Sequence, residues 1–242
     1  MFSGLVRNIG VVERFEGGKI AIRSNLRPKI GASIAINGIC TTAISTQGGV
    51  FCAILSSETQ KCVALENLQI PRTKVHLEEA LRASDRMDGH IVQGHIDSIG
   101  EILRVERSEN GFDFIVAYPQ EIRPLLVPKG SVAIDGISLT INAVDSASFR
   151  LTIIPHTFDN TLFHTYKPAR RVNIETDIFA RSIHHILQNM MDSAPHTQNP
   201  RLTPHTQNPR FTPHTQNPHF TPPTHSQDSA LWQKIDNILM SY

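Results

Sequence analysis

Two kinds of reactive side chain stand at matched positions of this chain. Cys40 precedes Ser138 by 98 residues, and Asn37 precedes Asp135 by the same distance. A thiol or hydroxyl can act as a nucleophile and a carboxylate can exchange a proton, whereas an amide only donates and accepts hydrogen bonds. The structural alternatives are a small buried cysteine and an ordinary turn-forming aspartate. The pattern favours two related pockets of different chemistry.

Two histidines lie in the segment Gly89-His-Ile-Val-Gln-Gly-His95. Imidazole titrates near neutrality, which suits a general base. On a regular strand, residues five apart face opposite sides unless a bulge at Gly94 intervenes. We expect one of them to reach a substrate and prefer His95, whereas His90 is interpreted as a hydrogen-bonded core histidine. A metal site of His90, His95 and Asp97 would need all three on one face, and no metal is predicted.

These residues belong to two copies of one module. The stretch Ser33-Ile-Ala-Ile-Asn-Gly-Ile-Cys-Thr-Thr42 returns as Ser131-Val-Ala-Ile-Asp-Gly-Ile-Ser-Leu-Thr140. The same offset relates Phe51 to Phe149 and Thr59 to Thr157, so the register continues into the next strand. The repeat predicts two homologous domains, residues 1–88 and 89–177, each near the size of a minimal domain.

The hydrophobic period inside each module is two, which indicates strands. Asn37-Gly38 and Asp135-Gly136 each separate two strand-like runs and favour hairpin turns with positive φ. Short strands with closely spaced turn signals predict an all-β fold of two six-stranded antiparallel barrels. We also expect a helix at Glu78–Arg82 to close the first copy, and a C-terminal helix over 178–192 capped by Asp177.

Composition limits the classes of partner. The net charge is +1 and 19% of residues are charged, so there is no basic surface typical of nucleic-acid binding. No apolar run approaches the ~18 residues of a membrane span. The three cysteines, an odd number without metal-ligand spacing, and the lack of a leader before Phe2 favour a cytoplasmic location.

Residues 193–229 carry a nine-residue repeat of the type Thr-Pro-His-Thr-Gln-Asn-Pro-Arg-Phe. Two prolines per unit and few apolar groups predict a disordered linker. Its evenly spaced histidines could chelate a metal, but we favour an expanded tandem duplication without chemical consequence. Residues 230–242 are amphipathic and predict a last helix, which could pack on the body or pair with a neighbouring subunit.

Seven ordered segments between residues 1 and about 188 resemble the α-subunit type of riboflavin synthase. They are Met1-Phe-Ser-Gly4, Asn37-Gly-Ile-Cys-Thr-Thr42, Ser57-Glu-Thr59, Gly89-His-Ile-Val-Gln-Gly-His-Ile-Asp97, Lys129-Gly-Ser-Val-Ala-Ile-Asp-Gly-Ile-Ser-Leu-Thr140, Ile154-Pro-His-Thr157 and Val172-Asn-Ile-Glu-Thr-Asp177. The resemblance implies Greek-key barrels like those of riboflavin kinase and ferredoxin reductase, each binding one 6,7-dimethyl-8-ribityllumazine.

The implied reaction is a dismutation. One lumazine gives a four-carbon unit to the other, yielding riboflavin and 5-amino-6-(D-ribitylamino)uracil without a cofactor. The family also implies a homotrimer with contacts through helix 178–192, an active site between the first barrel of one subunit and the second barrel of its neighbour, and an association with lumazine synthase.

The resemblance assigns catalytic roles to His95, Cys40, Ser138 and Asp135. The residues that it predicts to bind substrate are Phe2, Ser3, Gly4, Leu5, Val6, Cys40, Thr41, Thr42, Ile54, Leu55, Ser56, Ser57, Glu58, Thr59, Gly94, His95, Ile96, Lys129, Ser138, Leu139, Thr140, Thr152, Ile153, Ile154, Pro155, His156, Thr157 and Asp177.

Four positions depart from the family pattern: Ser3, Thr41, Val63 and Asp88. Thr41 and Asp88 add polarity near the first pocket, which would fit weaker binding there. The runner-up function is therefore a non-catalytic lumazine- or flavin-binding protein of the same fold, although that group lacks the Gly-His…Gly-His segment present here. A third hypothesis, a trimeric scaffold whose tail tethers partners, would require degenerate pocket positions.

Overall fold

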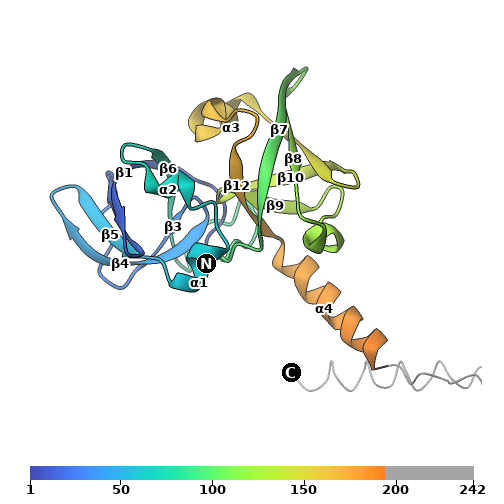
Figure 1. Cartoon of the computed structure of the whole chain (residues 1–242), viewed down its shortest axis with the longest axis horizontal. Helices are drawn as coiled ribbons and strands as arrows, with labels where there is room; N and C mark the ends of the chain where they lie inside the picture. Colours follow the sequence, from blue (N-terminus) through green and yellow to red (C-terminus); the bar gives the residue numbers. More distant parts are fainter. Residues whose placement is uncertain (194–242) are drawn as a thin grey trace, which may run out of the picture. The chain divides into compact units, whose positions relative to one another are not determined.

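The computed structural model describes residues 1–193, and the last helix 230–242 and all but the first residue of the predicted linker 193–229 lie outside them. Two closed antiparallel barrels follow each other along the chain (Figure 1). The first contains β1 (Asn8–Glu16), β2 (Lys19–Arg23), β3 (Ser33–Ile36), β4 (Ile39–Gln47), β5 (Val50–Ile54) and β6 (Lys74–Glu79). The second contains β7 (Ser98–Ser108), β8 (Gly111–Ala117), β9 (Ser131–Ile134), β10 (Ile137–Val144), β11 (Ser148–Ile153) and β12 (Arg171–Thr176).

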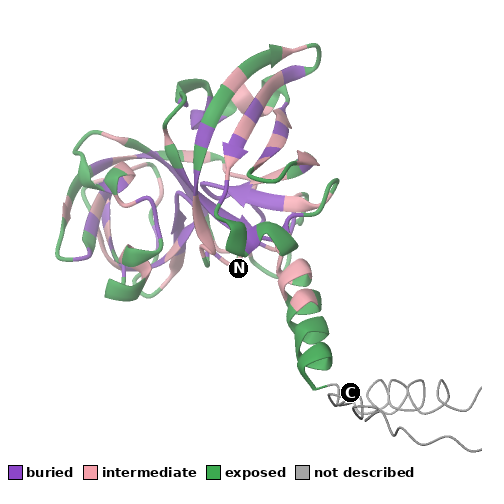
Figure 2. Cartoon of the chain, turned by 45° about the vertical axis from the view of Figure 1, so that its right-hand side comes forward, coloured by how far each residue is buried: buried purple, intermediate pink, exposed green. Residues whose placement is uncertain are grey.

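Both barrels have the same strand order. The first runs β1-β2-β5-β4-β3-β6, and the second repeats this circle with β7 to β12, so the predicted duplicated six-stranded fold is confirmed. Alternate residues point inward, as in β11, where Phe149, Leu151 and Ile153 are buried. Figure 2 shows buried stretches along the strands of both barrels. Asn37 and Asp135 have φ of 46° and 45° and each precedes a positive-φ glycine, which confirms the two tight turns.

The helices are short except the last. They are α1 (Ser57–Lys61), α2 (Glu66–Gln69), the 3-10 helix Gln120–Leu125, α3 (Pro155–Asn160), the 3-10 helix Leu162–Thr165 and α4 (Ile178–Asp192). The predicted C-terminal helix is confirmed, and its cap Asp177 accepts a bond from the Phe179 N–H at 2.7 Å. No helix of residues 1–193 is long and apolar enough to cross a membrane.

The predicted helix at Glu78–Arg82 is wrong. Glu78 and Glu79 belong to β6, where they pair with Ala35 and Ile34 of β3. On its other edge β6 pairs with β1, for example Leu77 with Asn8. The strand therefore closes the barrel, and the backbone bonds to both neighbours outweigh the helical propensity of the glutamates.

The barrels are joined through His76 and Asn173, which occupy equivalent positions of β6 and β12. The His76 Nδ1 lies 3.2 Å from the carbonyl oxygen of Asp135, and the Asn173 side chain donates to the carbonyl oxygen of Asn37 at 2.9 Å. Each side chain thus reaches the hairpin turn of the other barrel. The exchange fixes the two barrels with buried, directional bonds.

Candidate active site

The first residues of each module cross to the opposite barrel. Phe2 and Val92 form an antiparallel bridge, and both are fully buried between the barrels. Beyond the bridge, the Gly4 carbonyl accepts from the Ser138 N–H, and the Gly94 carbonyl accepts from the Cys40 N–H, both at 2.9 Å. We call residues 2–6 the first crossing segment and residues 92–96 the second crossing segment.

Both crossings depend on a glycine. Gly4 and Gly94 have φ of +75° and +80°, values that L side chains rarely adopt. A Cβ atom at Gly4 would lie 2.6 Å from the Ser138 Cβ, and one at Gly94 would lie 2.6 Å from the Cys40 Cβ. The glycines therefore allow each segment to lie directly against the reactive residue of the other barrel.

Each crossing segment completes a pocket on the barrel that it reaches. The first cup, on the first barrel, has a volume of about 360 Å³ and is lined by Cys40, Ser56, Glu58, Thr59, Cys62, Val63, Gly94, His95 and Ile96. The second cup, on the second barrel, has a volume of about 220 Å³ and is lined by Gly4, Leu5, Val6, Arg7, Ile137, Ser138, His156, Thr157, Asn160 and Thr161.

The two cups are equivalent in construction and different in chemistry. Thr59 and Thr157 occupy equivalent positions and are identical. Cys40 of the first cup is replaced by Ser138 in the second, and His95 is replaced by Leu5. The first cup therefore offers a thiol and an imidazole on its own lining. The second offers the hydroxyl of Ser138, the imidazole of His156 and a more polar helix end.

The two predicted histidines lie in different surroundings. The second crossing segment is not a regular strand, since β7 begins only at Ser98. His95 is exposed and lines the first cup. His90 is nearly buried, and its Nδ1 lies 2.7 Å from the Ser138 Oγ of the second cup. His90 lines neither cup and is hydrogen-bonded, as predicted for a core histidine, and which histidine reaches a substrate stays a prediction. Within residues 1–193, His90, His95 and Asp97 do not form a group of metal-ligating side chains.

The environment of His90 favours a neutral imidazole. Burial lowers the pKa of His90, and the negative charge of Asp177 partly opposes that shift. The Nε2 of His90 is buried without a hydrogen-bond partner among residues 1–193. A neutral ring with one nitrogen on a hydroxyl can accept its proton, which is the arrangement of a base beside a nucleophile.

Asp135 is placed away from both cups. Its carboxylate is fully buried and accepts bonds from the Tyr166 hydroxyl at 2.5 Å and the Asn173 N–H at 2.8 Å. The Arg170 guanidinium lies 3.8 Å away. Burial raises the pKa of Asp135, while Arg170 and the hydrogen bonds act against it. These contacts link β12 to the Asp135 turn.

The predicted binding residues divide into two groups. Those that line a cup are Gly4, Leu5, Val6, Cys40, Ser56, Glu58, Thr59, Gly94, His95, Ile96, Ser138, His156 and Thr157. Those outside both linings are Phe2, Ser3, Thr41, Thr42, Ile54, Leu55, Ser57, Lys129, Leu139, Thr140, Thr152, Ile153, Ile154, Pro155 and Asp177. Within the second group, Phe2, Ser3 and Thr41 are buried, and Lys129 is exposed on a positive-φ turn.

Six lining residues were not predicted: Arg7, Cys62, Val63, Ile137, Asn160 and Thr161. Two of the pairs could have been found from the repeat, because Cys62 and Asn160, like Val63 and Thr161, are 98 residues apart. These positions lie at the ends of the short helices α1 and α3, where the period-two pattern of the strands gives no signal.

Comparisons with known proteins agree with this architecture. A family model described as the lumazine binding domain matches the chain twice, over residues 3–80 and 93–177. The riboflavin synthase of Photobacterium phosphoreum is 36% identical over 195 residues, which cover 77% of this chain and 89% of that protein. The riboflavin synthase of Bacillus subtilis is 32% identical over 194 residues, with 77% and 90% covered.

Among solved structures, LumP complexed with riboflavin aligns with a TM-score of 0.65 at 16% identity. The alignment covers 73% of this chain and 99% of that one. LumP complexed with 6,7-dimethyl-8-(1'-D-ribityl) lumazine aligns with a TM-score of 0.63. At this identity the likeness shows a shared fold.

Proposed function

The chain belongs to the riboflavin synthase family, and we propose that its two cups bind the two 6,7-dimethyl-8-ribityllumazine molecules of the dismutation. One lumazine donates a four-carbon unit to the other, giving riboflavin and 5-amino-6-(D-ribitylamino)uracil. The observation that carries the assignment is the pair of equivalent cups with unlike reactive groups. Equivalent cups suit identical substrates, and unlike groups suit their opposite roles.

The reaction needs a base and a nucleophile. One lumazine loses a proton from its C7 methyl group, and the other accepts a nucleophile at C7 before the carbon–carbon bond forms. We assign His95 as the base of the first cup, with Cys40 beside it in the lining. In the second cup, His90 takes the proton of the Ser138 hydroxyl, to which its Nδ1 is bonded. Two substrates of one composition become two products of the same total composition, so no oxidant is required.

The site is proposed to form between copies of the chain. The two cups share no lining residue, and we infer that a second copy of the chain brings a first cup against a second cup. Helix α4 presents an apolar face for such an assembly. Figure 2 shows most of this helix as exposed, and its exposed large apolar residues are Phe179, Ile183, Ile186, Leu187, Met190 and Met191. A homotrimer in the cytoplasm fits these features, and association with lumazine synthase stays a prediction.

The direct test is turnover of 6,7-dimethyl-8-ribityllumazine by the full chain, followed through riboflavin fluorescence. We expect the wild type to form riboflavin, and Cys40→Ser and His95→Gln to lower kcat by about 100-fold. Cys52→Ser is the matched control, because Cys52 is half-buried on β5 and lies outside both cups. Tight lumazine binding without riboflavin formation would instead support the non-catalytic alternative.

A further inference from the structure

Two carboxylates at equivalent positions of the barrels lie behind the two crossing segments. Glu78 is on β6 and Glu175 is on β12, and both are buried. Neither lines a cup. We propose that Glu78 and Glu175 are positioning residues, each holding the backbone of one crossing segment so that it presses against the reactive residue of the opposite barrel. The proposal rests on the proposed function for its catalytic consequence, but its geometry can be tested separately.

Glu175 holds the second crossing segment. Its two oxygens accept from the N–H groups of Gln93 at 2.7 Å and Gly94 at 2.8 Å. The carbonyl oxygen of Gly94 accepts a second hydrogen bond, from the N–H of Cys40 in the first barrel. Gly94 is therefore fixed from both sides, and His95, the next residue, enters the first cup in a fixed position.

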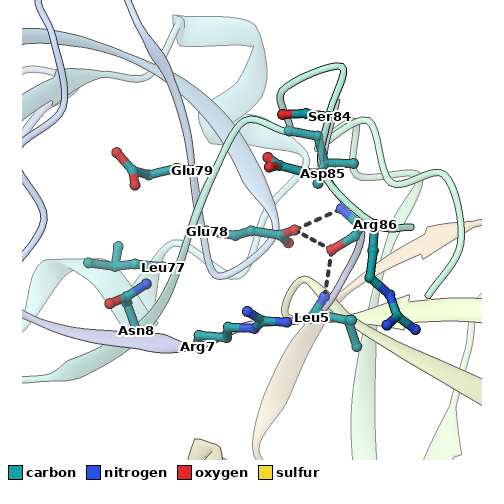
Figure 3. Close-up of a pocket in the computed structure, with 11 residues that line it drawn as sticks. Leu5, Arg7, Asn8, Leu77, Glu78, Glu79, Ser84, Asp85 and Arg86 are labelled. Carbon is teal, nitrogen blue, oxygen red and sulfur yellow. Dashed lines mark hydrogen bonds between the residues drawn. The ribbon is translucent and has the colours of Figure 1, made fainter. Parts of the chain in front are cut away.

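Glu78 holds the first crossing segment in the same way. It accepts from the Ser3 N–H at 2.7 Å, the Ser3 hydroxyl at 2.8 Å and the Gly4 N–H at 3.1 Å. The Ser3 oxygen in turn accepts from the Leu5 N–H at 3.2 Å. Figure 3 shows the two bonds from Ser3 to Glu78 and the bond from the Leu5 N–H to the Ser3 hydroxyl. The residues drawn line an open cavity, which has a volume of about 420 Å³. The Gly4 carbonyl then meets the Ser138 N–H.

The chemistry of a carboxylate explains why this residue type stands at both places. Burying a carboxylate is costly unless its oxygens accept hydrogen bonds. The backbone N–H groups of the crossing segment supply these bonds, so the carboxylate stabilises the segment in this position. Two oxygens accept from two successive N–H groups, and these bonds are strongest when the carboxyl is ionised, which for Glu175 requires a pH above its raised pKa of about 7. A glutamine would supply one oxygen and would turn an N–H donor toward the second peptide N–H.

The two holding sites differ in one respect. Arg181 of α4 donates to Asp97 at 2.7 Å and to the Gln93 side chain at 2.9 Å, and it lies 3.7 Å from Glu175. The counterpart of Asp97 in the first module is Arg7, which offers no acceptor for such a guanidinium. The segment that carries His95 is therefore tied to α4 as well, whereas Glu78 borders the open cavity.

Thiol labelling of the full chain tests the geometry without turnover. The rate of alkylation of Cys40 by iodoacetamide is measured by peptide mass spectrometry, with Cys52 as the internal reference. Glu175→Ala is expected to raise the Cys40 rate at least about tenfold, which corresponds to about 1.4 kcal/mol, because two bonds to a charged group are lost. Glu175→Gln should give a smaller rise, and Glu78→Ala should leave the Cys40 rate unchanged.

Turnover supplies the second measurement. The Glu175 variants are expected to lower kcat, with Gln retaining more activity than Ala, while the melting temperature serves as the control for folding. Arg181→Met keeps the carboxylate and provides a variant if Glu175→Ala does not fold; it should raise Cys40 labelling by less than Glu175→Gln does. An unchanged Cys40 rate in folded Glu175→Gln and Arg181→Met would overturn the proposal. A wild type without turnover would refute the proposed function, while labelling would still decide the geometry.

Discussion

The Nδ1 of His90 lies 2.7 Å from the Oγ of Ser138, although the two residues are 48 positions apart and belong to different parts of the second module. The contact forms because Gly89 lies tightly against the barrel, where a Cβ would come within 3.1 Å of the Ser138 Cβ. The equivalent residue of the first cup, Cys40, is placed beside Gly94 and shares its lining with His95.

If His90 and Ser138 act as a unit, their substitutions will not be additive. We expect His90→Gln and Ser138→Ala each to lower kcat by about 100-fold, and the double variant to be no slower than the slower single one. Steady-state turnover of all four proteins measures this. If kcat of the double variant fell by the product of the two single-variant factors, the two residues would act independently.

Gly94→Ala is expected to disable the first cup. The substitution places a Cβ 2.6 Å from that of Cys40 and imposes a positive φ on alanine, at a strain of about 1–2 kcal/mol. We expect kcat/KM to fall at least about tenfold. Gly17→Ala is the control, since Gly17 has φ +56° with nothing within 4 Å of an added Cβ. Equal losses in both variants would attribute the effect to backbone strain alone.

His76 should make the fold acid-sensitive. Its Nε2 accepts from the Leu162 N–H at 2.8 Å, so the buried ring must remain neutral, and burial lowers its pKa to about 3. In the unfolded chain His76 has the ordinary histidine pKa of about 6.5. Below that pH it binds a proton in the unfolded chain, whereas the buried ring of the folded chain stays neutral. The free energy of unfolding should therefore fall as the pH drops, by about 2 kcal/mol at pH 5 from this group.

The control for that experiment is the variant His76→Asn. It introduces the residue type that the second barrel has at the equivalent position, Asn173. Glu175 acts in the opposite sense: burial raises its pKa to about 7, so the folded chain holds the extra proton between the unfolded carboxyl pKa and pH 7. Urea unfolding from pH 5 to 8 should show that the stability of wild type relative to His76→Asn declines toward pH 5. A difference that does not change with pH would contradict the assignment.

The exposed apolar face of α4 predicts a charge-sensitive assembly. Ile183 is 58% exposed, and Ile183→Glu would place a charge in the proposed contact. We expect the variant to sediment as a smaller species than wild type and to lose turnover while keeping both barrels folded. Gln188→Glu, at an exposed polar position on the opposite face of the same helix, is the control. Wild type that sediments as a monomer with full activity would refute the interchain site.

The sequence by itself determined the duplicated barrel. The alternation of apolar residues and the turns at Asn37 and Asp135 are local signals, and the 98-residue offset repeats them, so the strands, their duplication and the matched pair Cys40 and Ser138 followed directly. The helix caps were local as well, as Asp177 shows. Each depends on neighbours a few residues away, where side-chain type and backbone geometry are tightly coupled.

Only the tertiary structure decided which residues meet across the modules. Glu78 belongs to a strand because closing the barrel needs partners on both edges, and His90 meets Ser138 because the crossing segments exchange barrels. Asp135 is a buried acceptor at the junction because β12 packs against its turn. These contacts join residues far apart in the chain, and nothing in the local pattern of apolar and polar residues specifies them.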